Sequence, residues 1–358
     1  MRDGQGPAPA AVRRRGSVGL AALVLAALLL AGLTWALTLG QADIAAGGVW
    51  TSAWHRVCTA LGGTAGAGWC AAEPLTTIEQ AIVWDGRAPR AVTAAAVGAG
   101  LAVCGGVMQA LTRNPLADPY LLGISSGASL GAVAVLVLGV SVILPVAAFA
   151  GALAALVLTL ALATARGGGL SPVRTILAGV AVAQACSALV SFVIFSSATG
   201  DSYREILAWL LGSLGGATWA DAAIAVGALA VVGVFLTAQG RTLDAFTFGD
   251  VSAASLGIDV RRTRWLLLTA VALLTGALVS VSGAIGFVGL VLPHAVRLLV
   301  GARHHRLLPL AALGGAAFLL AADTAARSIA EPRELPVGIL TAAIGAPAFA
   351  LLLRRSTT

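Results

Sequence analysis

Long stretches without charge constrain this chain more than any other feature of its sequence. Residues 18–39, VGLAALVLAALLLAGLTWALTL, contain no ionisable side chain. A helix of about 20 apolar residues crosses the hydrocarbon core of a bilayer. Only 10% of the 358 residues are charged, whereas about a quarter of the residues in a soluble domain are charged. The sequence therefore predicts an all-α integral membrane protein.

Nine further spans are expected after the first. An uncharged run between Arg90 and Arg113 predicts the second, and the run 119–165 is long enough for two helices that break near Pro145. The remaining spans are expected at 175–197, 222–239, 265–281, 283–301, 307–325 and 337–353. The eighth of the ten is rich in glycine and holds a proline, so it is expected to be interrupted.

Three hydrophilic segments flank or separate the spans. Residues 1–16 are rich in Gly, Pro and Ala and end in an arginine run, so they predict a disordered cytoplasmic tail. The rest of the chain, 17–355, is expected to be one transmembrane domain. Its two long hydrophilic segments, 40–81 and 241–264, are expected outside and inside the membrane, respectively.

The arginines predict the orientation of the chain. Cytoplasmic loops carry an excess of Lys and Arg, and ten spans place both ends of the chain on one side. With the N-terminus inside, only six arginines fall outside: Arg56, Arg87, Arg90, Arg204, Arg327 and Arg333. The chain is therefore expected to be N-in and C-in, in the plasma or inner membrane of the cell.

The four cysteines fall into two classes. Cys104 and Cys186 lie within apolar runs and are expected to pack as small hydrophobic residues. Cys58 and Cys70 share the outer loop, where an oxidising compartment permits a disulfide. The sequence leaves open whether that pair is bonded.

Several classes of function are disfavoured. The chain has no lysine, so it has no phosphate-binding loop of the type G-x-x-x-x-G-K-[ST], and any ATP is expected to be hydrolysed by another subunit. The net charge of +7 is not gathered on one face, so no nucleic-acid partner is expected. No motif for an enzyme, a metal or a cofactor is found, and His304 and His305 are expected to be a solvated basic loop.

The stretch TRNPLADPYLLGISSGASLG (112–131) raises two alternatives. Its Asn-Pro and Asp-Pro pairs are typical of a tight helical hairpin at the inner surface. Glycine- and proline-interrupted segments also mark substrate pathways in secondary transporters. An ion-coupled transporter needs ionisable groups near the membrane midplane, and Asp221 and Asp323 are instead expected to be solvated near span ends. A membrane scaffold or assembly factor without transport activity is a further hypothesis for the function of the whole chain.

Two long blocks resemble the signatures of the FecCD-like permeases. They are RAPRAVTAAAVGAGLAVCGGVMQALTRNPLADPYLLGISSGASLGAV (87–133) and the segment 282–353, which begins SGAIGFVGLVLPHAVRLL. The residues that we assign to the structural signature are Asn114, Pro115, Asp118, Pro119, Gly123, Pro293 and His294.

The resemblance implies the fold of a type II ABC importer permease with ten spans and no catalytic residues of its own. It also implies four kinds of partner: a second permease subunit in a homodimer or heterodimer, two cytoplasmic ATPase subunits, an extracytoplasmic substrate-binding protein, and membrane lipid. The implied cargo is an iron-siderophore complex, the commonest case, with haem or cobalamin as alternatives.

The resemblance also assigns roles to individual residues. Arg87, Arg90 and Arg327 are expected to dock the binding protein, with positive caps at helix ends as the alternative. Ser171 and Pro172 are weaker candidates for an inner gate. The expected coupling loop to the ATPase contains Phe248, Gly249, Asp250, Ser252, Ser255, Leu256 and Gly257. His304 stands where the family usually has an acidic residue, and the long outer loop has no assigned role.

Overall fold

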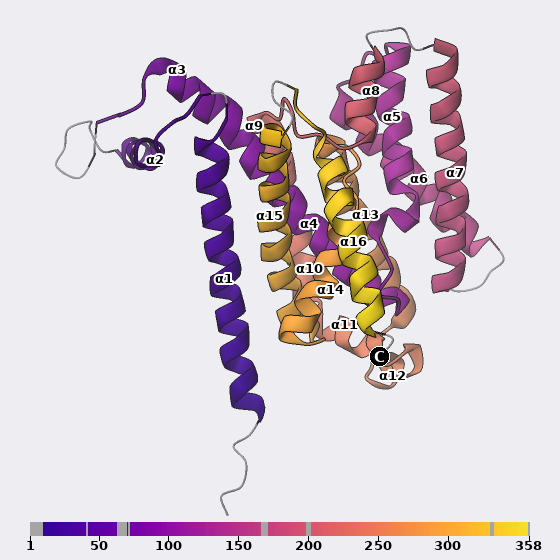
Figure 1. Ribbon diagram of the computed structural model, residues 1–358. Helices are drawn as coiled ribbons and strands as arrows, with labels where there is room; N and C mark the ends of the chain where they lie inside the picture. Colours follow the sequence, from indigo (N-terminus) through magenta and orange to yellow (C-terminus); the bar gives the residue numbers. More distant parts are fainter. Residues whose placement is uncertain are drawn as a thin grey trace, which may run out of the picture.

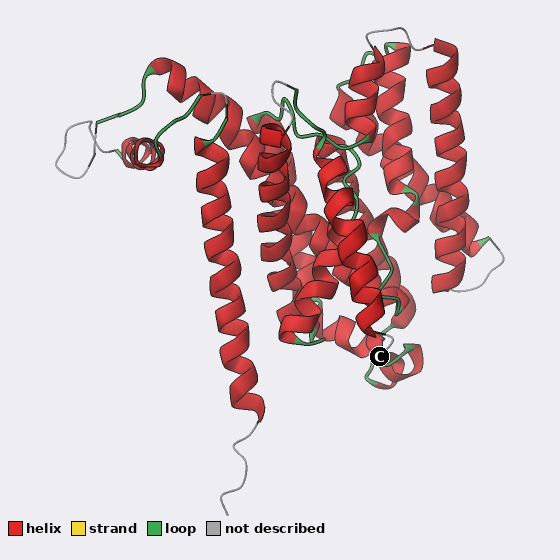
Figure 2. Cartoon of the chain, in the orientation of Figure 1, coloured by secondary structure: helices red, strands yellow, loops and turns green. Residues whose placement is uncertain are grey.

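The computed structural model describes residues 10–40, 42–62, 70, 72–165, 171–197, 202–329 and 333–356. Every regular element in this part of the chain is a helix (Figure 2). Seven helices are long and apolar enough to cross a membrane, and three shorter apolar helices, 124–138, 288–300 and 337–351, accompany them. These ten segments correspond to the ten spans that hydropathy predicts.

The helices follow one another along the chain as shown in Figure 1. They are α1 (Ala10–Thr38), α2 (Ala46–Ala60), α3 (Thr77–Gln80), η1 (Ala81–Arg87), α4 (Ala88–Thr112), η2 (Pro119–Leu122), α5 (Ile124–Leu138), α6 (Leu144–Thr164), α7 (Pro172–Ser197), α8 (Ser202–Leu210), α9 (Trp219–Ala228), η3 (Leu229–Gly233), α10 (Val234–Ala238), α11 (Gly240–Thr247), α12 (Asp250–Ser255), α13 (Val260–Ser282), α14 (Val288–Val300), α15 (His304–Ile329) and α16 (Val337–Ser356).

Two expected boundaries are wrong. Residues 10–16 of the expected disordered tail already belong to α1, and residues 1–9 lie outside the described part of the chain. The second span begins well before Arg90, because α3, the π-helical η1 and α4 form one helical stretch from Thr77 to Thr112. The capping box at its start explains the earlier boundary, since Thr76 and Glu79 satisfy each other's backbone N–H groups.

The centre of the bundle is α4. In the most apolar 18 residues of the Thr77–Thr112 stretch, 89% of the residues are buried, whereas only 17% are buried in the corresponding part of α1. Small residues permit this burial, because they let helix backbones approach closely in a membrane. A Cβ atom added to Gly98 would collide with the carbonyl oxygen of Gly315 on α15, and one added to Gly105 would collide with that of Gly289 on α14.

A second group of helices, α5 to α8, stands beside this centre (Figure 1). Helices α5 and α6 approach each other at Gly127, Gly131 and Gly151, whose backbones leave no space for a Cβ atom. The break between them falls at 139–143, and Pro145 lies in the first turn of α6, as predicted.

Both ends of the described chain lie at one end of the bundle. The start of α1, the end of α16 and the short helix α12 are at the bottom of Figure 1, and α2, α3 and α8 are at the top. The bottom is the inner side according to the arginine distribution. The structure therefore places both ends of the chain on one side, as ten spans require, and the arginine distribution assigns that side as the inner one.

Candidate functional site

The expected coupling loop lies at the inner end of the bundle as a pair of short helices, α11 and α12 (Figure 1). Two glycines make the turns on either side of α12. Gly249 has a φ of 100° and Gly257 a φ of 81°, a region that residues with a Cβ atom rarely adopt. The sequence-based assignment of these two glycines to sharp turns is therefore confirmed.

A buried arginine attaches α12 to the bundle. The two terminal nitrogens of Arg264, on α13, donate to the Asp250 carboxylate at 2.7 and 3.2 Å. The same guanidinium lies over the ring of Phe246 at 5.5 Å from its centroid. The two serines of α12 form local hydrogen bonds: Ser252 Oγ donates to the carbonyl of Phe248, and Ser255 Oγ donates to the carbonyl of Ser252. Motion of α12 is thus linked to α13.

Three large apolar side chains on and next to α12 are exposed. Phe248 is 80% exposed, Val251 85% and Leu256 70%. Exposed large hydrophobic side chains that cluster on one short segment mark interaction surfaces. We call Phe248, Val251 and Leu256 the inner apolar patch.

A second attachment joins the coupling helices to α15. The backbone N–H of His304 donates to Asp244 Oδ1 on α11, and His304 Nδ1 lies 2.8 Å from the same oxygen. The expectation of a solvated His304 is wrong, because the side chain is buried between α11 and the start of α15. Sequence reasoning missed both Asp244, which lies 60 residues from His304, and Arg264, which lies 14 residues from Asp250.

At the outer end, the structure brings together the three arginines expected to dock a binding protein. Arg87, Arg90 and Arg327 line one cavity of about 480 Å³, together with Asp85 and Glu334. The three arginines come from the junction of η1 with α4 and from the last turn of α15. The sequence predicts the shared location but not what these side chains bind within the chain.

Arg90 is the most firmly held of the three. It donates two hydrogen bonds to Asp323, at 2.8 and 2.9 Å, and one to Glu334 at 2.6 Å. Asp323 is 1% exposed, so the expectation that it is solvated is wrong. A buried carboxylate of this kind requires a partner, and the partner lies on α4, far earlier in the chain.

The other two arginines bind backbone carbonyls. Arg87 donates to the carbonyl oxygens of Leu37 and Thr38, the last two residues of α1, and to that of Ala42 just beyond the helix. Arg327 donates to Ala36 at 3.0 Å. The last carbonyls of a helix have no partner within it, so these arginines cap the outer end of α1.

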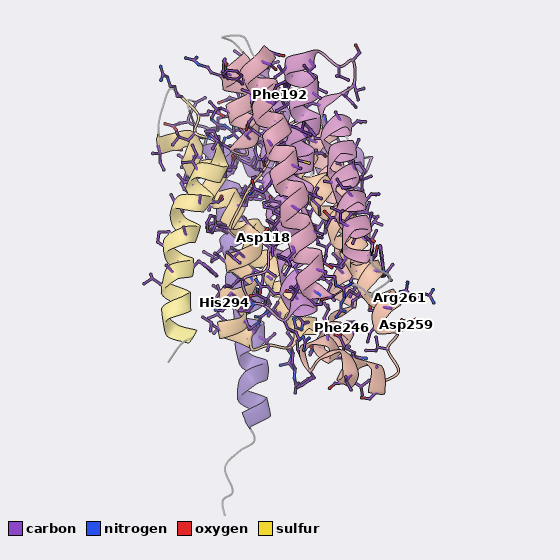
Figure 3. The ribbon with its side chains drawn as sticks, turned by 90° about the vertical axis from the view of Figure 1, so that its right-hand side faces the viewer. Asp118, Phe192, Phe246, Asp259, Arg261 and His294 are labelled. Atoms are coloured by element: carbon purple, nitrogen blue, oxygen red, sulfur yellow. A yellow bond between two sulfur atoms is a disulfide. The ribbon has the colours of Figure 1, made fainter. Side chains whose placement is uncertain are left out.

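The signature stretch forms a hairpin inside the bundle. The Asp118 side chain accepts from the backbone N–H of Tyr120 and so caps η2. The Tyr120 hydroxyl donates to the carbonyl oxygen of Ile285 at 2.8 Å. Figure 3 shows Asp118 closer to the middle of the bundle than Asp259 and Arg261, so its expected place at the inner surface is wrong.

The other signature residues have local roles. Asn114 accepts from the backbone N–H of Leu116, and Gly123 adopts a φ of 76° where η2 meets α5. Pro293 lies inside α14, with the half-buried His294 after it, and Figure 3 shows His294 nearer the inner end than Asp118.

The remaining candidates lie at two loops. Cys58 and Cys70 are joined by a disulfide, and their Cα atoms are 5.8 Å apart. Pro172 is the first residue of α7, and the carbonyl of Ser171 accepts from Thr175 in the first turn. Residues 166–170, directly before these two gate candidates, lie outside the described part of the chain.

Comparison with known proteins adds independent information. The sequence matches the FecCD transport family over residues 27–355. It is 48% identical to the cobalamin import system permease protein BtuC of Halobacterium salinarum, over 77% of this chain and 74% of that protein. It is 43% identical to the hemin transport system permease protein HmuU of Yersinia pestis, over 75% of this chain and 82% of that protein.

The fold also resembles a solved structure described as an inward-facing conformation of a putative metal-chelate type ABC transporter. The TM-score is 0.79 at 29% sequence identity, and the match covers 93% of this chain and 98% of the solved chain.

Proposed function

Because the chain belongs to the FecCD transport family and is a permease subunit of an ABC importer in the cell membrane, we propose that it forms the membrane pathway for a cobalt- or iron-containing tetrapyrrole. A corrinoid is the favoured cargo. Its support is the 48% identity to a cobalamin permease, followed by the 43% identity to a hemin permease. An iron-siderophore, the cargo expected from the sequence, has no support among these relatives.

The inner apolar patch is the observation that supports a separate ATPase. Phe248, Val251 and Leu256 present an uncharged surface on the water-facing side of the chain. We propose that α12 inserts these side chains into a groove of an ATPase subunit. Through Asp250 to Arg264 and through Asp244 to His304, movement of the ATPase would displace α13 and α15. The absence of lysine from the chain fits this division of labour.

The outer cavity is the proposed docking place for a substrate-binding protein. Its arginines are partly neutralised within the chain, which revises the expectation of three free docking charges. Glu334 is the partner that can exchange, since its side chain is 54% exposed while that of Asp323 is 2% exposed. We propose that an acidic side chain of the binding protein competes with Glu334 for Arg90 and lies near Arg327.

A second permease subunit completes the proposed assembly. The hydrophobic faces of α7, including Phe192 and Phe195, are exposed in the single chain. Figure 3 shows Phe192 on the outward side of the bundle, near its outer end. Co-purification of the subunit with its ATPase would decide between the two assemblies: a second, different permease chain in the complex would indicate a heterodimer, and its absence a homodimer.

An ion-coupled secondary transporter is the alternative function. The position of Asp118 inside the bundle is the type of feature that this alternative needs, and Asp118 lines a cavity with Gln184 and Tyr120. Its carboxylate, however, already caps η2, which supports a structural role.

Transport in reconstituted vesicles tests the proposal. The chain, its ATPase and its binding protein would be reconstituted, and uptake of cyanocobalamin, hemin and a ferric siderophore compared. We expect ATP-dependent uptake with cyanocobalamin preferred, and no change when proton and sodium gradients are collapsed. Uptake without ATP would contradict the importer mechanism, and uptake of the siderophore alone would contradict only the cargo.

A further inference from the structure

Helix α2 in the outer loop carries an apolar stripe that is exposed in the described part of the chain. Trp50, Trp54 and Val57 lie in α2, and Leu61 caps its C-terminal end. They follow one another at intervals of four, three and four residues, so they share one side of the helix. Trp54 is 51% exposed and Leu61 75% exposed, and Trp50 and Val57 are exposed as well. We call these four residues the α2 stripe.

The opposite side of α2 is fixed to the protein. Val49 and Ser52 are fully buried on that side. Trp84 Nε1 donates to Ser52 Oγ, and Ser52 Oγ donates to the Glu73 carboxylate, both at 3.0 Å. The disulfide from Cys58 to Cys70 holds the end of the helix. These contacts fix the rotation of α2, so the α2 stripe cannot turn inward to hide its side chains.

The α2 stripe is aimed toward the membrane. Trp50 Nε1 donates to Thr34 Oγ1 at 3.2 Å, and Thr34 lies one turn before the outer end of α1. Figure 1 shows α2 end-on beside the top of α1, so its axis crosses that of the spanning helix. Leu20, Leu23, Leu28 and Leu30 of α1 are exposed further down. The α2 stripe therefore continues an apolar surface that lies in the bilayer.

We propose that α2 is an interfacial helix that rests in the outer leaflet, with the α2 stripe among the lipid head groups and upper acyl chains. Tryptophan is enriched at this depth, because its ring is amphipathic, and a helix with one apolar side lies in the plane of the interface. No charged residue interrupts the α2 stripe. The outer loop thereby receives a second attachment to the membrane, besides α1 and the η1–α4 helix.

Brominated lipids test the depth of the two tryptophans. The full chain and its W50F/W54F variant would be reconstituted in phosphatidylcholine vesicles brominated near the glycerol end of the acyl chain or near its middle. The difference in fluorescence between the two proteins reports Trp50 and Trp54. We expect strong quenching of this difference by the shallow bromines, weaker quenching by the deep ones, and little quenching by aqueous acrylamide.

Two further variants make the result decisive. W265F, a change at the inner part of α13, should leave the quenched contribution of Trp50 and Trp54 in place. W54F alone preserves the hydrogen bond of Trp50 and guards against misfolding of the double variant. Quenching by acrylamide without quenching by bromolipid would overturn the proposal and would show that the α2 stripe opens to water, where a protein partner could bind it.

Discussion

The two ends of the molecule differ in which kind of side chain is buried. At the outer end, charged side chains are buried and find their partners inside the chain, as Arg90 does with Asp323 and Glu334. At the inner end, apolar side chains that would normally be buried are exposed, as in Phe248 and Val251. Arg90 and Asp323 at the outer end are paired within the chain, whereas the apolar side chains of the inner apolar patch are exposed in its described part. Substitutions of the buried charges at the outer end should therefore affect folding, and those of the exposed apolar side chains at the inner end should affect assembly.

The largest effect is expected at the outer end, for Asp323→Ala. This change leaves the Arg90 guanidinium buried without its main partner, which typically costs about 3–5 kcal/mol. Thermal unfolding of the purified chain in detergent would show the loss as a lower Tm. Asp85→Ala, at an exposed position in the same cavity, is the matched control and should change stability by less than about 0.5 kcal/mol. An equal loss of stability in the two variants would show that the buried pair of Arg90 and Asp323 contributes no more than an exposed residue.

A smaller effect of a different kind is expected at the inner end, for Val251→Asp. The side chain is exposed, so the Tm of the isolated chain should not change. A charge placed in the contact with the ATPase should weaken assembly by about 1–3 kcal/mol, or roughly 5- to 150-fold in Kd. Binding of the purified ATPase measures this change.

Val142→Asp places the same charge at an exposed position in the outer break between α5 and α6. It should leave ATPase affinity unaltered. If Val251→Asp lowered the Tm and left the affinity unchanged, the comparison between the two ends would fail.

The smallest effect is expected for Glu334→Gln. Removing this exposed charge frees part of Arg90 for an acidic partner, and exposed ion pairs contribute only about 0.2–1 kcal/mol. Affinity for the binding protein should rise by up to roughly fivefold, and the rise should shrink at high salt. Glu205→Gln, on α8 at the outer end and away from the three arginines, is the control. A weaker complex would refute the proposed exchange.

Much of the fold could be predicted because most of the chain lies in lipid. Hydropathy alone locates the spans, since lipid excludes charge from long stretches, and the arginines orient them. Gly249 and Gly257 could be assigned to turns because a positive φ is a property of the single residue and favours glycine. These features depend on a few neighbouring residues, which a sequence displays directly.

The errors concern contacts between distant residues. Asp323 was expected in water because it lies near the end of a predicted span, yet Arg90 reaches it from α4. His304 was expected in a solvated loop, yet Asp244 binds it. Asp118 lies deeper than expected because the hairpin after α4 folds into the bundle, and local turn signals say nothing about depth.

The pairing of Arg90 with Asp323 also imposes an order on synthesis. The two residues are 233 positions apart, and a ribosome adds about 5–20 residues per second, so Arg90 emerges about 10–50 s before its partner. During that interval, the second span must keep a guanidinium near the outer surface of the membrane without the carboxylate that later binds it. Closure of this pair is therefore an event of late assembly, after the ninth span has entered the membrane.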